Sequence, residues 1–426
     1  MALNYIWIGF FLIGFAVALC RVIGYYFRHY FEQTFGWVFD KADLSVFSDI
    51  VNSTFTMAEA SVNIAIYLIG VMTLWLGLMK IGEMGGAVNV LSRIVGPFFS
   101  KLFPELPKNH PAGGSMLMNF SANMLGLDNA ATPLGLKAMH ELQTINPSKD
   151  TASNSQIMFL VLNTSGLTLI PISVMALRAA EGAVNPSDIF LPILIATYFS
   201  TLAGLIVVSI YQRINLFQPI ILTYLIGITA IIVGVMYYFN GLSQEQAGII
   251  SSLVGNFILF SIIIGFIVLA LRRRINIYDS FIDGAKEGFE VAIKIIPFLV
   301  AMLVAIGVFR ASGAMDIMVS SIGSVFGFLG FNTDFVPALP TALMKPLSGS
   351  GARGMMVEAM QTYGVDSFVG RLASTIQGST ETTFYTLAVY YGAVSIKNTR
   401  YTVTCGLIAD FFGILAAIVV GYIFFY

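Results

Sequence analysis

Long apolar stretches, separated by short polar turns, recur along the whole chain. An α-helix needs about 20 predominantly apolar residues to cross the interior of a lipid bilayer. Stretches of about that length cover residues 2–20, 58–80, 155–178, 188–211, 217–239, 247–271, 288–310, 368–393 and 402–425. The alternating segments of about ten residues that mark a membrane β-barrel are not evident. The pattern therefore predicts an all-α polytopic membrane protein.

Two further apolar regions are interrupted before they reach spanning length. They are "PAGGSMLMNFSANMLGLDNAATPLGLKAMHEL", residues 111–142, and "PALPTALMKPLSGSGARGMMVEAM", residues 337–360. Each has a short apolar arm, a tip of Gly, Asn, Ser or Pro, and a second short arm. This arrangement is typical of a re-entrant helical hairpin, which enters and leaves the membrane on one side. Irregular backbone survives at membrane depth only where protein or a wet cavity surrounds it, so we expect both tips to lie inside the protein.

Two of the predicted spans carry polar residues and helix breakers near their centres. In residues 155–178 the motif "NTSG" at Asn163–Gly166 precedes Pro171, and in residues 368–393 the motif "QGSTE" occupies Gln377–Glu381. Gly weakens a helix and Pro removes one of its backbone hydrogen bonds. We therefore expect each of these spans to be a discontinuous helix.

The order of elements in the first half of the chain repeats in the second half. Each half contains a span, an amphipathic segment (84–104 or 311–331) expected along the membrane surface, a hairpin, a broken span and a final span. "IATYFSTLA", residues 195–203, also matches much of "IADFFGILA", residues 408–416. The Arg272–Arg274 triplet marks a cytoplasmic loop, and counting from it the first repeat starts outside and the second starts inside. We therefore predict two inverted-topology repeats, with chance similarity among apolar segments as the alternative.

This arrangement divides the chain into consecutive parts. An N-terminal helix with an amphipathic loop segment covers residues 1–57, and the first repeat covers residues 58–213. Two linking transmembrane helices cover residues 214–275, and the second repeat covers residues 276–426. Because the apolar N-terminus lacks a basic flank, we expect it to be retained as the first helix.

Composition narrows the class of function. Only 11% of the residues are charged, against about 25% in soluble domains, and the formal net charge is −1. This balance does not favour a nucleic-acid partner. Cys20 and Cys405 lie in apolar segments where packing is expected, and the histidines show no metal-ligand spacing. No HExxH, GxSxG or other catalytic set is evident, so we expect neither an enzyme nor a bound metal or organic cofactor.

Inverted repeats with broken helices are a transporter architecture, in which the solute binds near the midplane of the membrane. The hairpins and breaks therefore supply the candidate substrate-binding residues: Asn119, Asn123, Asp128, Asn129, Thr132, Asn163, Thr164, Ser165, Lys345, Ser348, Ser350, Arg353, Gln377, Ser379, Thr380 and Glu381. Asp128 at the first tip could instead form a structural salt bridge with Lys345 or Arg353 at the second. Each hydroxyl could likewise bond only its own helix or a neighbouring one.

The hairpin and break motifs also resemble known families. "MNFSANMLGLDNAATPLGLKAMHELQ" with "FLVLNTSGLTLIPISVMALR" resembles the spore maturation protein A family, and "ALPTALMKPLSGSGARGMMVEAM" with "STIQGSTETTFYTLAVYYG" resembles the spore maturation protein B family. The chain looks like both, fused head to tail. Both belong to the nucleoside-recognition or gate domains, which are distantly similar to concentrative nucleoside transporters. The resemblance implies a multi-pass protein of the bacterial inner membrane, with cores that associate as a homodimer or trimer.

Together, the pattern and the resemblance lead to one leading function and one alternative. We expect a protein like a secondary transporter, which binds a small polar solute, anionic or nucleoside-like, between the two hairpins and couples to a proton or a sodium ion. Lys345 and Arg353 at the second tip motivate the anion. The alternative is a membrane scaffold or solute sensor of the spore maturation type that moves nothing. A channel fits less well, because two hairpins would occlude the path.

Overall fold

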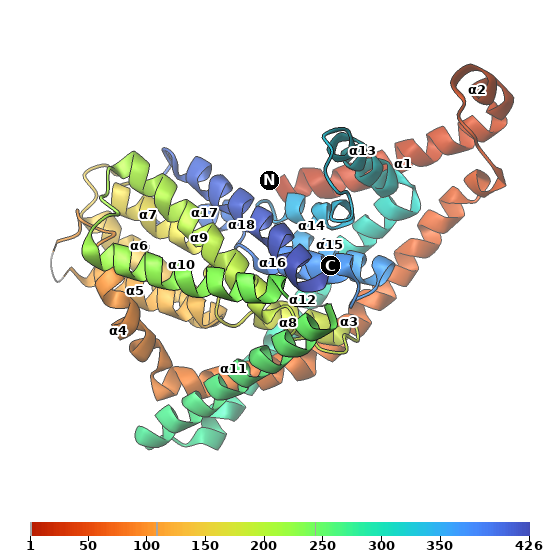
Figure 1. Ribbon diagram of the computed structural model, residues 1–426. Coiled ribbons are helices and arrows are strands. Elements are labelled where there is room, and N and C mark those ends of the chain that lie inside the picture. Colours follow the sequence, from red (N-terminus) through yellow and green to blue (C-terminus); the bar gives the residue numbers. More distant parts are fainter. Residues whose placement is uncertain (1, 108–109, 243) are drawn as a thin grey trace.

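The computed structural model describes residues 2–107, 110–242 and 244–426. Within these ranges every regular element is a helix, and the single β-bridge joins Thr151 to Asn398. Helices of the first and second halves of the chain interleave (Figure 1). The all-α class predicted from the hydropathy pattern is confirmed.

The helices of the first half of the chain include one very long helix and one closely packed pair of short helices. In chain order they are α1 (Ala2–Tyr26), α2 (Arg28–Phe35), the 3₁₀ turn η1 (Lys41–Leu44), α3 (Val46–Gly85), α4 (Ala87–Phe99), α5 (Pro111–Met124), α6 (Asp128–Thr144), α7 (Asn154–Ser165), α8 (Ile172–Ala180) and α9 (Phe190–Gln212). The apolar region 111–142 folds as α5 and α6, which pack against each other.

Two long helices then lead to a second half with the same order of elements. The remaining helices are α10 (Pro219–Asn240), α11 (Gln244–Arg272), α12 (Ile277–Ala311), α13 (Ala314–Phe328), the 3₁₀ turn η2 (Val336–Ala338), α14 (Leu339–Met344), α15 (Gly349–Tyr363), α16 (Phe368–Gly378), α17 (Thr383–Ala393) and α18 (Thr402–Phe425). The apolar region 337–360 folds as η2, α14 and α15, of which the last two pack together.

Seven helices in the described part of the chain are long and apolar enough to cross a membrane. They cover Asn4–Tyr26, Val46–Gly85, Phe190–Gln212, Pro219–Asn240, Gln246–Arg272, Ile277–Ala311 and Thr402–Phe425. The two remaining predicted spans, 155–178 and 368–393, are divided into α7 with α8 and α16 with α17. The chain is therefore a multi-pass membrane protein. One boundary differs from expectation, because α3 runs unbroken through residue 57, where we placed the end of the N-terminal part.

The long helices α3 and α12 pack antiparallel along most of their length. Gly307 of α12 lies against Met57 of α3, while Gly288 lies against Met72, so that the sequence numbers run in opposite directions. Gly284 and Gly288 form a GxxxG motif, which lets two helix backbones approach closely. A Cβ atom added at Gly288 would lie 2.5 Å from the carbonyl oxygen of Met72. The absence of a side chain is therefore what allows this contact.

We expect Gly288→Leu to weaken the α3–α12 contact, because the clashing atom is backbone and cannot rotate away. Overpacking of this kind typically destabilises by about 1–3 kcal/mol. Thermal unfolding of the purified protein in detergent measures the effect. Gly265→Leu in α11 is the matched control, since a Cβ there meets nothing within 4 Å. Equal melting temperatures for the two variants would contradict the role assigned to the motif.

The terminal spans of the two halves, α9 and α18, are also antiparallel neighbours. A Cβ atom at Gly204 would meet Ala409, and one at Gly413 would meet Ser200. The hydroxyl of Ser200 donates to the carbonyl oxygen of Ala409 at 3.0 Å. Helices α3 with α12 and α9 with α18 occupy the same places in the order of elements of the two halves, and each pair runs in opposite directions.

Connecting segments of the first half contact connecting segments of the second half at two places. In the first, which we call the ionic contact, Arg178 in α8 forms ion pairs with Asp188 at 3.0 Å and Asp366 at 2.9 Å. Arg371 in α16 pairs with Asp188 at 2.7 Å. The Arg178 side chain is 0% exposed. The connection between α8 and α9 is therefore held to the connection between α15 and α16.

The second crossing, which we call the backbone contact, uses peptide groups. The amide nitrogens of Lys397 and Asn398 donate to the carbonyl oxygen of Asp150 at 2.8 and 2.9 Å, and the amide of Ala152 donates to Asn398 at 3.0 Å. Arg400 adds a side-chain bond to the Ala152 carbonyl at 3.1 Å. Here the α17–α18 connection of the second half contacts the α6–α7 connection of the first half. In the order of elements these correspond to the α8–α9 and α15–α16 connections of the ionic contact, so the two halves exchange places between the two contacts.

Candidate functional site

Four irregular segments meet near the centre of the bundle. Two are the tips of the helix pairs, residues 125–127 and 345–348, which we call the first and second tips. The other two are the helix interruptions at residues 166–171 and 379–382, which we call the first and second breaks. Each segment lacks regular helix, so its backbone groups need partners outside a helix.

Backbone hydrogen bonds connect these segments in a repeated pattern. In the first half, the amide of Leu169 donates to the carbonyl oxygen of Met124 at 2.7 Å, which ties the first break to the end of α5. In the second half, the amide of Phe384 donates to Pro346 at 3.0 Å, which ties the start of α17 to the second tip. A third bond, from the Glu381 amide to the Thr164 carbonyl at 2.9 Å, joins the two halves.

Glycines make the close approach at these segments possible. Gly166 ends α7 with φ +60°, and a Cβ atom there would lie 3.1 Å from the Glu381 amide nitrogen. Gly126 at the first tip has φ +72°, and its Cβ would lie 2.8 Å from the Ile170 carbonyl oxygen. Left-handed backbone favours glycine, and neither place has room for a side chain. Steric constraints therefore explain why glycine occupies Gly166 in "NTSG" and Gly126 in "LGLD".

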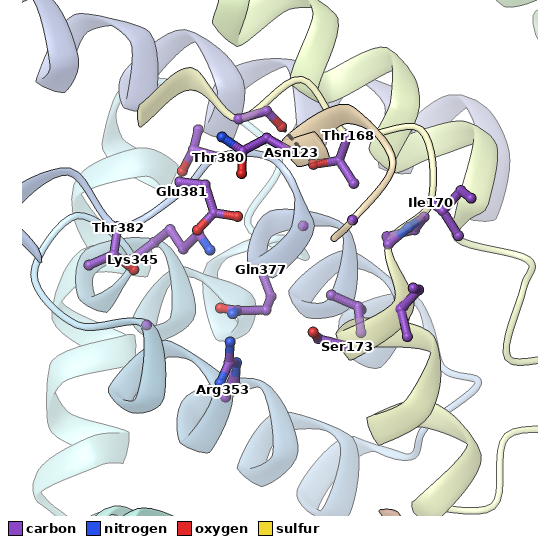
Figure 2. Close-up of a pocket in the computed structure, with 17 residues that line it drawn as sticks. Asn123, Thr168, Ile170, Ser173, Lys345, Arg353, Gln377, Thr380, Glu381 and Thr382 are labelled. Carbon is purple, nitrogen blue, oxygen red and sulfur yellow. Dashed lines mark hydrogen bonds between the residues drawn. The ribbon is translucent and has the colours of Figure 1, made fainter. Parts of the chain in front are cut away.

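A small cavity of about 100 Å³ lies where the breaks and tips meet (Figure 2). The first half of the chain contributes Asn123, Thr168 and Ser173, and the second half contributes Lys345, Arg353, Gln377, Thr380, Glu381 and Thr382. The N-terminal ends of α8 and α15 border it through Ile172 and Gly349. Polar groups from both halves therefore face one space.

A larger cleft of about 620 Å³ continues from this cavity. Asn123, Gly349, Arg353, Glu381 and Thr382 line both spaces. The cleft adds Thr132, Asn163, Ser348 and Ser350 to the polar lining, and α12 and α17 add the aromatic residues Phe298, Phe384, Tyr385 and Tyr390. Its size is in the range that holds small organic ligands.

Ionisable groups cluster beside the cavity. The Lys345 residue is 4% exposed and Asp410 in α18 is 1% exposed. Thr383 donates its hydroxyl to an Asp410 carboxylate oxygen at 2.7 Å. Lys345 and Glu381 both act electrostatically on the Asp410 carboxyl, and Figure 2 shows their side chains extending toward one another. Ionisable groups are expensive inside a membrane protein, so this cluster is a candidate functional region.

Three polar atoms of the cavity lining have no hydrogen-bond partner in the described structure. They are Oγ1 of Thr380, Nε of Arg353, and Oε1 of Gln377, a residue that is 5% exposed. Figure 2 shows the side chains of Gln377 and Arg353 pointing toward one another in the cavity. Burying an unsatisfied polar group costs about 1–3 kcal/mol, so such groups call for an explanation.

The structure brings ten of the predicted site residues to the two spaces. These are Asn123, Thr132, Asn163, Lys345, Ser348, Ser350, Arg353, Gln377, Thr380 and Glu381. Asn123 and Asn163 also bond each other at 2.8 Å, which links the first helix pair to α7. Whether these residues bind a solute stays a prediction.

Four other predicted residues lie nearby but face backbone. Thr164, Ser165 and Ser379 donate their hydroxyls to carbonyl groups three residues earlier in their own helices. Asn119 donates to the carbonyl oxygen of Ala131 at 2.7 Å, across the first helix pair. The side chains of Asp128 and Asn129 lie outside the described residues, and so does the predicted pairing of Asp128 with Lys345 or Arg353.

Sequence reasoning missed several residues of the site. Thr168, Ser173 and Thr382 line the cavity, and Asp410 lies behind it. Thr168 and Thr382 are next to the two motifs, so extending each motif to the whole break would have found them. Asp410 is an acid in the predicted span 402–425, and its spacing in the sequence gives no sign of its contact with Thr383. Among the described residues, no group of three or more His, Cys, Asp or Glu residues could hold a metal ion.

Comparison with known proteins agrees with this division of the site between two halves. A family model for nucleoside recognition, named Gate, matches residues 65–181 and 292–397. Spore maturation protein B of Bacillus subtilis (strain 168) is 46% identical over 159 residues, which cover 37% of this chain and 88% of that protein. Spore maturation protein A of the same organism is 38% identical over 204 residues, 48% of this chain and 92% of that protein. The two matches cover different parts of the chain.

No solved structure matches the chain. The two Gate matches include both helix pairs and both breaks, so the family covers the segments that form the cavity and the cleft. The chain belongs to the Gate family of nucleoside-recognition domains.

Proposed function

We propose that this protein binds a small polar solute, anionic or nucleoside-like, in the cavity between the two helix pairs and carries it across the bacterial inner membrane as a secondary transporter. One observation carries the proposal. Both tips and both breaks, contributed by different halves of the chain, line a single polar cavity inside an apolar bundle. In this proposal a proton or a sodium ion drives uptake, and neither an organic cofactor nor any other metal ion takes part.

The proposal includes two inverted-topology repeats with re-entrant hairpins, residues 58–213 and 276–426, joined by linking helices in residues 214–275 and preceded by an N-terminal part in residues 1–57. Two observations support it. The equivalent helices α3 with α12 and α9 with α18 are antiparallel. The ionic and backbone contacts exchange the roles of the two halves. Both are what a two-fold axis in the membrane plane would produce.

Helix ends support the solute class. The N-termini of α8, α15 and α17 border the cavity or the cleft through Ile172, Gly349 and Thr382. A helix N-terminus carries about half a positive charge and free amide groups, which stabilise a negative or strongly polar group. Together with Lys345 and Arg353, these ends make the site suited to an anionic part of a solute.

Uptake by purified protein in liposomes tests the proposal. The solutes are radiolabelled nucleosides, amino acids and small carboxylates, each under an imposed proton gradient and an imposed sodium gradient. We expect at least one class to accumulate only with an imposed gradient. Failure of every class under both gradients would contradict transport.

Glu381 is the residue at which coupling can be tested separately. The Glu381→Gln variant keeps the shape of the side chain and removes its charge, while the backbone bond to Thr164 remains. We expect uptake to lose its dependence on pH or on sodium while the yield and melting temperature stay unchanged. The control is Glu290→Gln, an exposed acid on α12. A drop in stability with unchanged coupling would assign Glu381 a structural role.

The second candidate function is a membrane scaffold or sensor that moves no solute. The names of the two relatives, which describe spore maturation and no solute, favour it. A disulfide between Thr151→Cys and Asn398→Cys tests the motion that a transporter needs and a scaffold does not. It can form because bridged positions lie about 5 Å apart, within disulfide range. A transporter that rocks its halves should stop when this bridge forms and recover on reduction. Uninhibited uptake would contradict such motion.

Association with other copies belongs to the same proposal. Large apolar side chains are exposed along α10 and α11, among them Ile231, Tyr237, Phe257 and Phe260. These helices contact lipid or a second copy, so a homodimer or trimer would form there. Mass measurement of the protein in lipid nanodiscs tests this point.

A further inference from the structure

The cavity and the cleft differ in chemistry although they share part of their lining. The cavity of about 100 Å³ has room for roughly three water molecules at about 30 Å³ each, or for one carboxylate or phosphate group. The cleft, at about 620 Å³, can take a whole organic molecule. Since Arg353 and Glu381 line both, a single ligand can extend from one into the other.

Of the two cationic residues that line the cavity, Lys345 and Arg353, Arg353 forms no ion pair with an acidic residue in the described part of the chain. It belongs to none of the ion pairs within 4.0 Å that the described side chains form. Lys345 is different, because it acts on Asp410 and shares the cavity with Glu381. The positive charge that is free for a ligand is therefore at Arg353, beside the N-terminus of α15.

Gln377 provides a second and independent sign of a ligand at the same place. It is almost fully buried, its Oε1 atom has no partner, and it faces Arg353 in the cavity (Figure 2). Its Nε2 can donate to an anion while Oε1 accepts from a protonated or hydroxyl-bearing group. The Nε2 group and Arg353 suit the acceptor oxygens of a carboxylate or a phosphate, and the protonated oxygen of a phosphate monoester would also donate to Oε1.

The cleft presents aromatic side chains to the remainder of the ligand. Phe384, Tyr385 and Tyr390 line the cleft from α17, and Phe298 lines it from α12. Aromatic rings prefer tilted or offset contacts with other rings, which contribute about 0.5–1.5 kcal/mol beyond buried area. A ligand with a ring would use this wall, whereas a small aliphatic anion would leave it uncovered.

We infer that the solute is an aromatic organic anion, with a carboxylate or phosphate head group at Arg353 and Gln377 and a planar ring in the cleft against α17. This inference rests on the proposed function and names the solute class of the same site. It assigns Arg353 and Gln377 to head-group binding and Phe384 and Tyr385 to ring binding.

Direct binding to the purified full chain in detergent tests the assignment with small probes. Benzoate and phenyl phosphate carry ring and charge, acetate carries charge without a ring, and benzyl alcohol and benzylamine carry the ring without a negative charge. We expect benzoate or phenyl phosphate to bind at least about tenfold more tightly than the other three. The better of the two identifies the head group.

Matched variants then locate the two ends of the ligand. Arg353→Gln should weaken the aromatic anion by about tenfold or more and leave benzyl alcohol unchanged, while Arg93→Gln, an exposed arginine on α4, should change neither. Phe384→Ala should weaken benzoate and leave acetate unchanged, with Phe257→Ala on α11 as its control. Normal melting temperatures exclude misfolding as the cause.

Other results would overturn the inference in ways that separate it from the proposed function. Equal affinity for acetate and benzoate, or tighter binding of a neutral nucleoside such as uridine, would contradict the aromatic anion and leave solute transport standing. Unchanged binding in Arg353→Gln would remove the head-group assignment. Binding of none of the probes, together with no uptake in liposomes, would contradict both.

Discussion

Replacing Arg178 by methionine is expected to lower the free energy of unfolding by about 3–5 kcal/mol, because it leaves Asp366 without its ion-pair partner and Asp188 with Arg371 alone. Arg178 is fully buried, and it binds Asp188, Asp366 and the carbonyl oxygen of Val365. Methionine keeps much of the volume and removes the charge. Thermal or denaturant unfolding in detergent measures the loss.

The control for Arg178→Met is Lys286→Met, which removes an exposed ion pair with Asp283. Exposed pairs contribute about 0–1 kcal/mol, so this variant should unfold much like the parent. The double variant Arg178→Met with Asp366→Leu should be less destabilised than the sum of its single changes, since the uncompensated acid is also gone. Additive effects would show that the ionic contact is not one coupled unit.

The second large effect is expected from Gly166→Val, at the point where the first break passes the second. Valine would have to adopt left-handed backbone, at about 1–2 kcal/mol, and would press on the Glu381 backbone, at about 1–3 kcal/mol. We therefore expect a loss of about 2–5 kcal/mol, together with loss of uptake, because the bond from Glu381 to Thr164 would lengthen.

Gly182→Val separates the two causes of this loss. Gly182 also has positive φ, at +81°, but a Cβ atom there meets nothing within 4 Å. It should therefore show the backbone strain alone and keep full uptake. If Gly182→Val and Gly166→Val were equally stable and equally active, the crossing of the breaks would have no part in the site.

Much of the fold could be predicted from local sequence. Apolar runs gave the spans, and the Gly and Pro residues of "NTSG" and "QGSTE" gave the interruptions of 155–178 and 368–393, because backbone conformation there depends on a few neighbouring residues. The full length of α3 could not be predicted from the hydropathy pattern. Hydropathy detects only its apolar part, whereas the helix begins twelve residues earlier, at Val46, and continues through polar positions such as Asn52.

The sequence was enough to predict which segments form the site, but not which residues contact one another within it. Asn123, Gln377 and Glu381 were expected to face a common space because they interrupt apolar segments, and all three line the cavity. The bond from Glu381 to Thr164 joins residues more than 200 positions apart and depends on how the halves pack. The sequence also could not show which hydroxyl groups face the cavity. Thr380 lines the cavity, whereas Ser379, one residue away, donates its hydroxyl to its own helix.

The lining of the cavity by both halves bears on how a cell can make this protein. Neither half alone contains both tips and both breaks. A fragment ending between α9 and α10 would therefore expose to lipid the polar residues with which the first half lines the cavity. Carrying the two halves on one polypeptide supplies them in equal number, inserts them together and leaves no surplus of one half for proteases to remove.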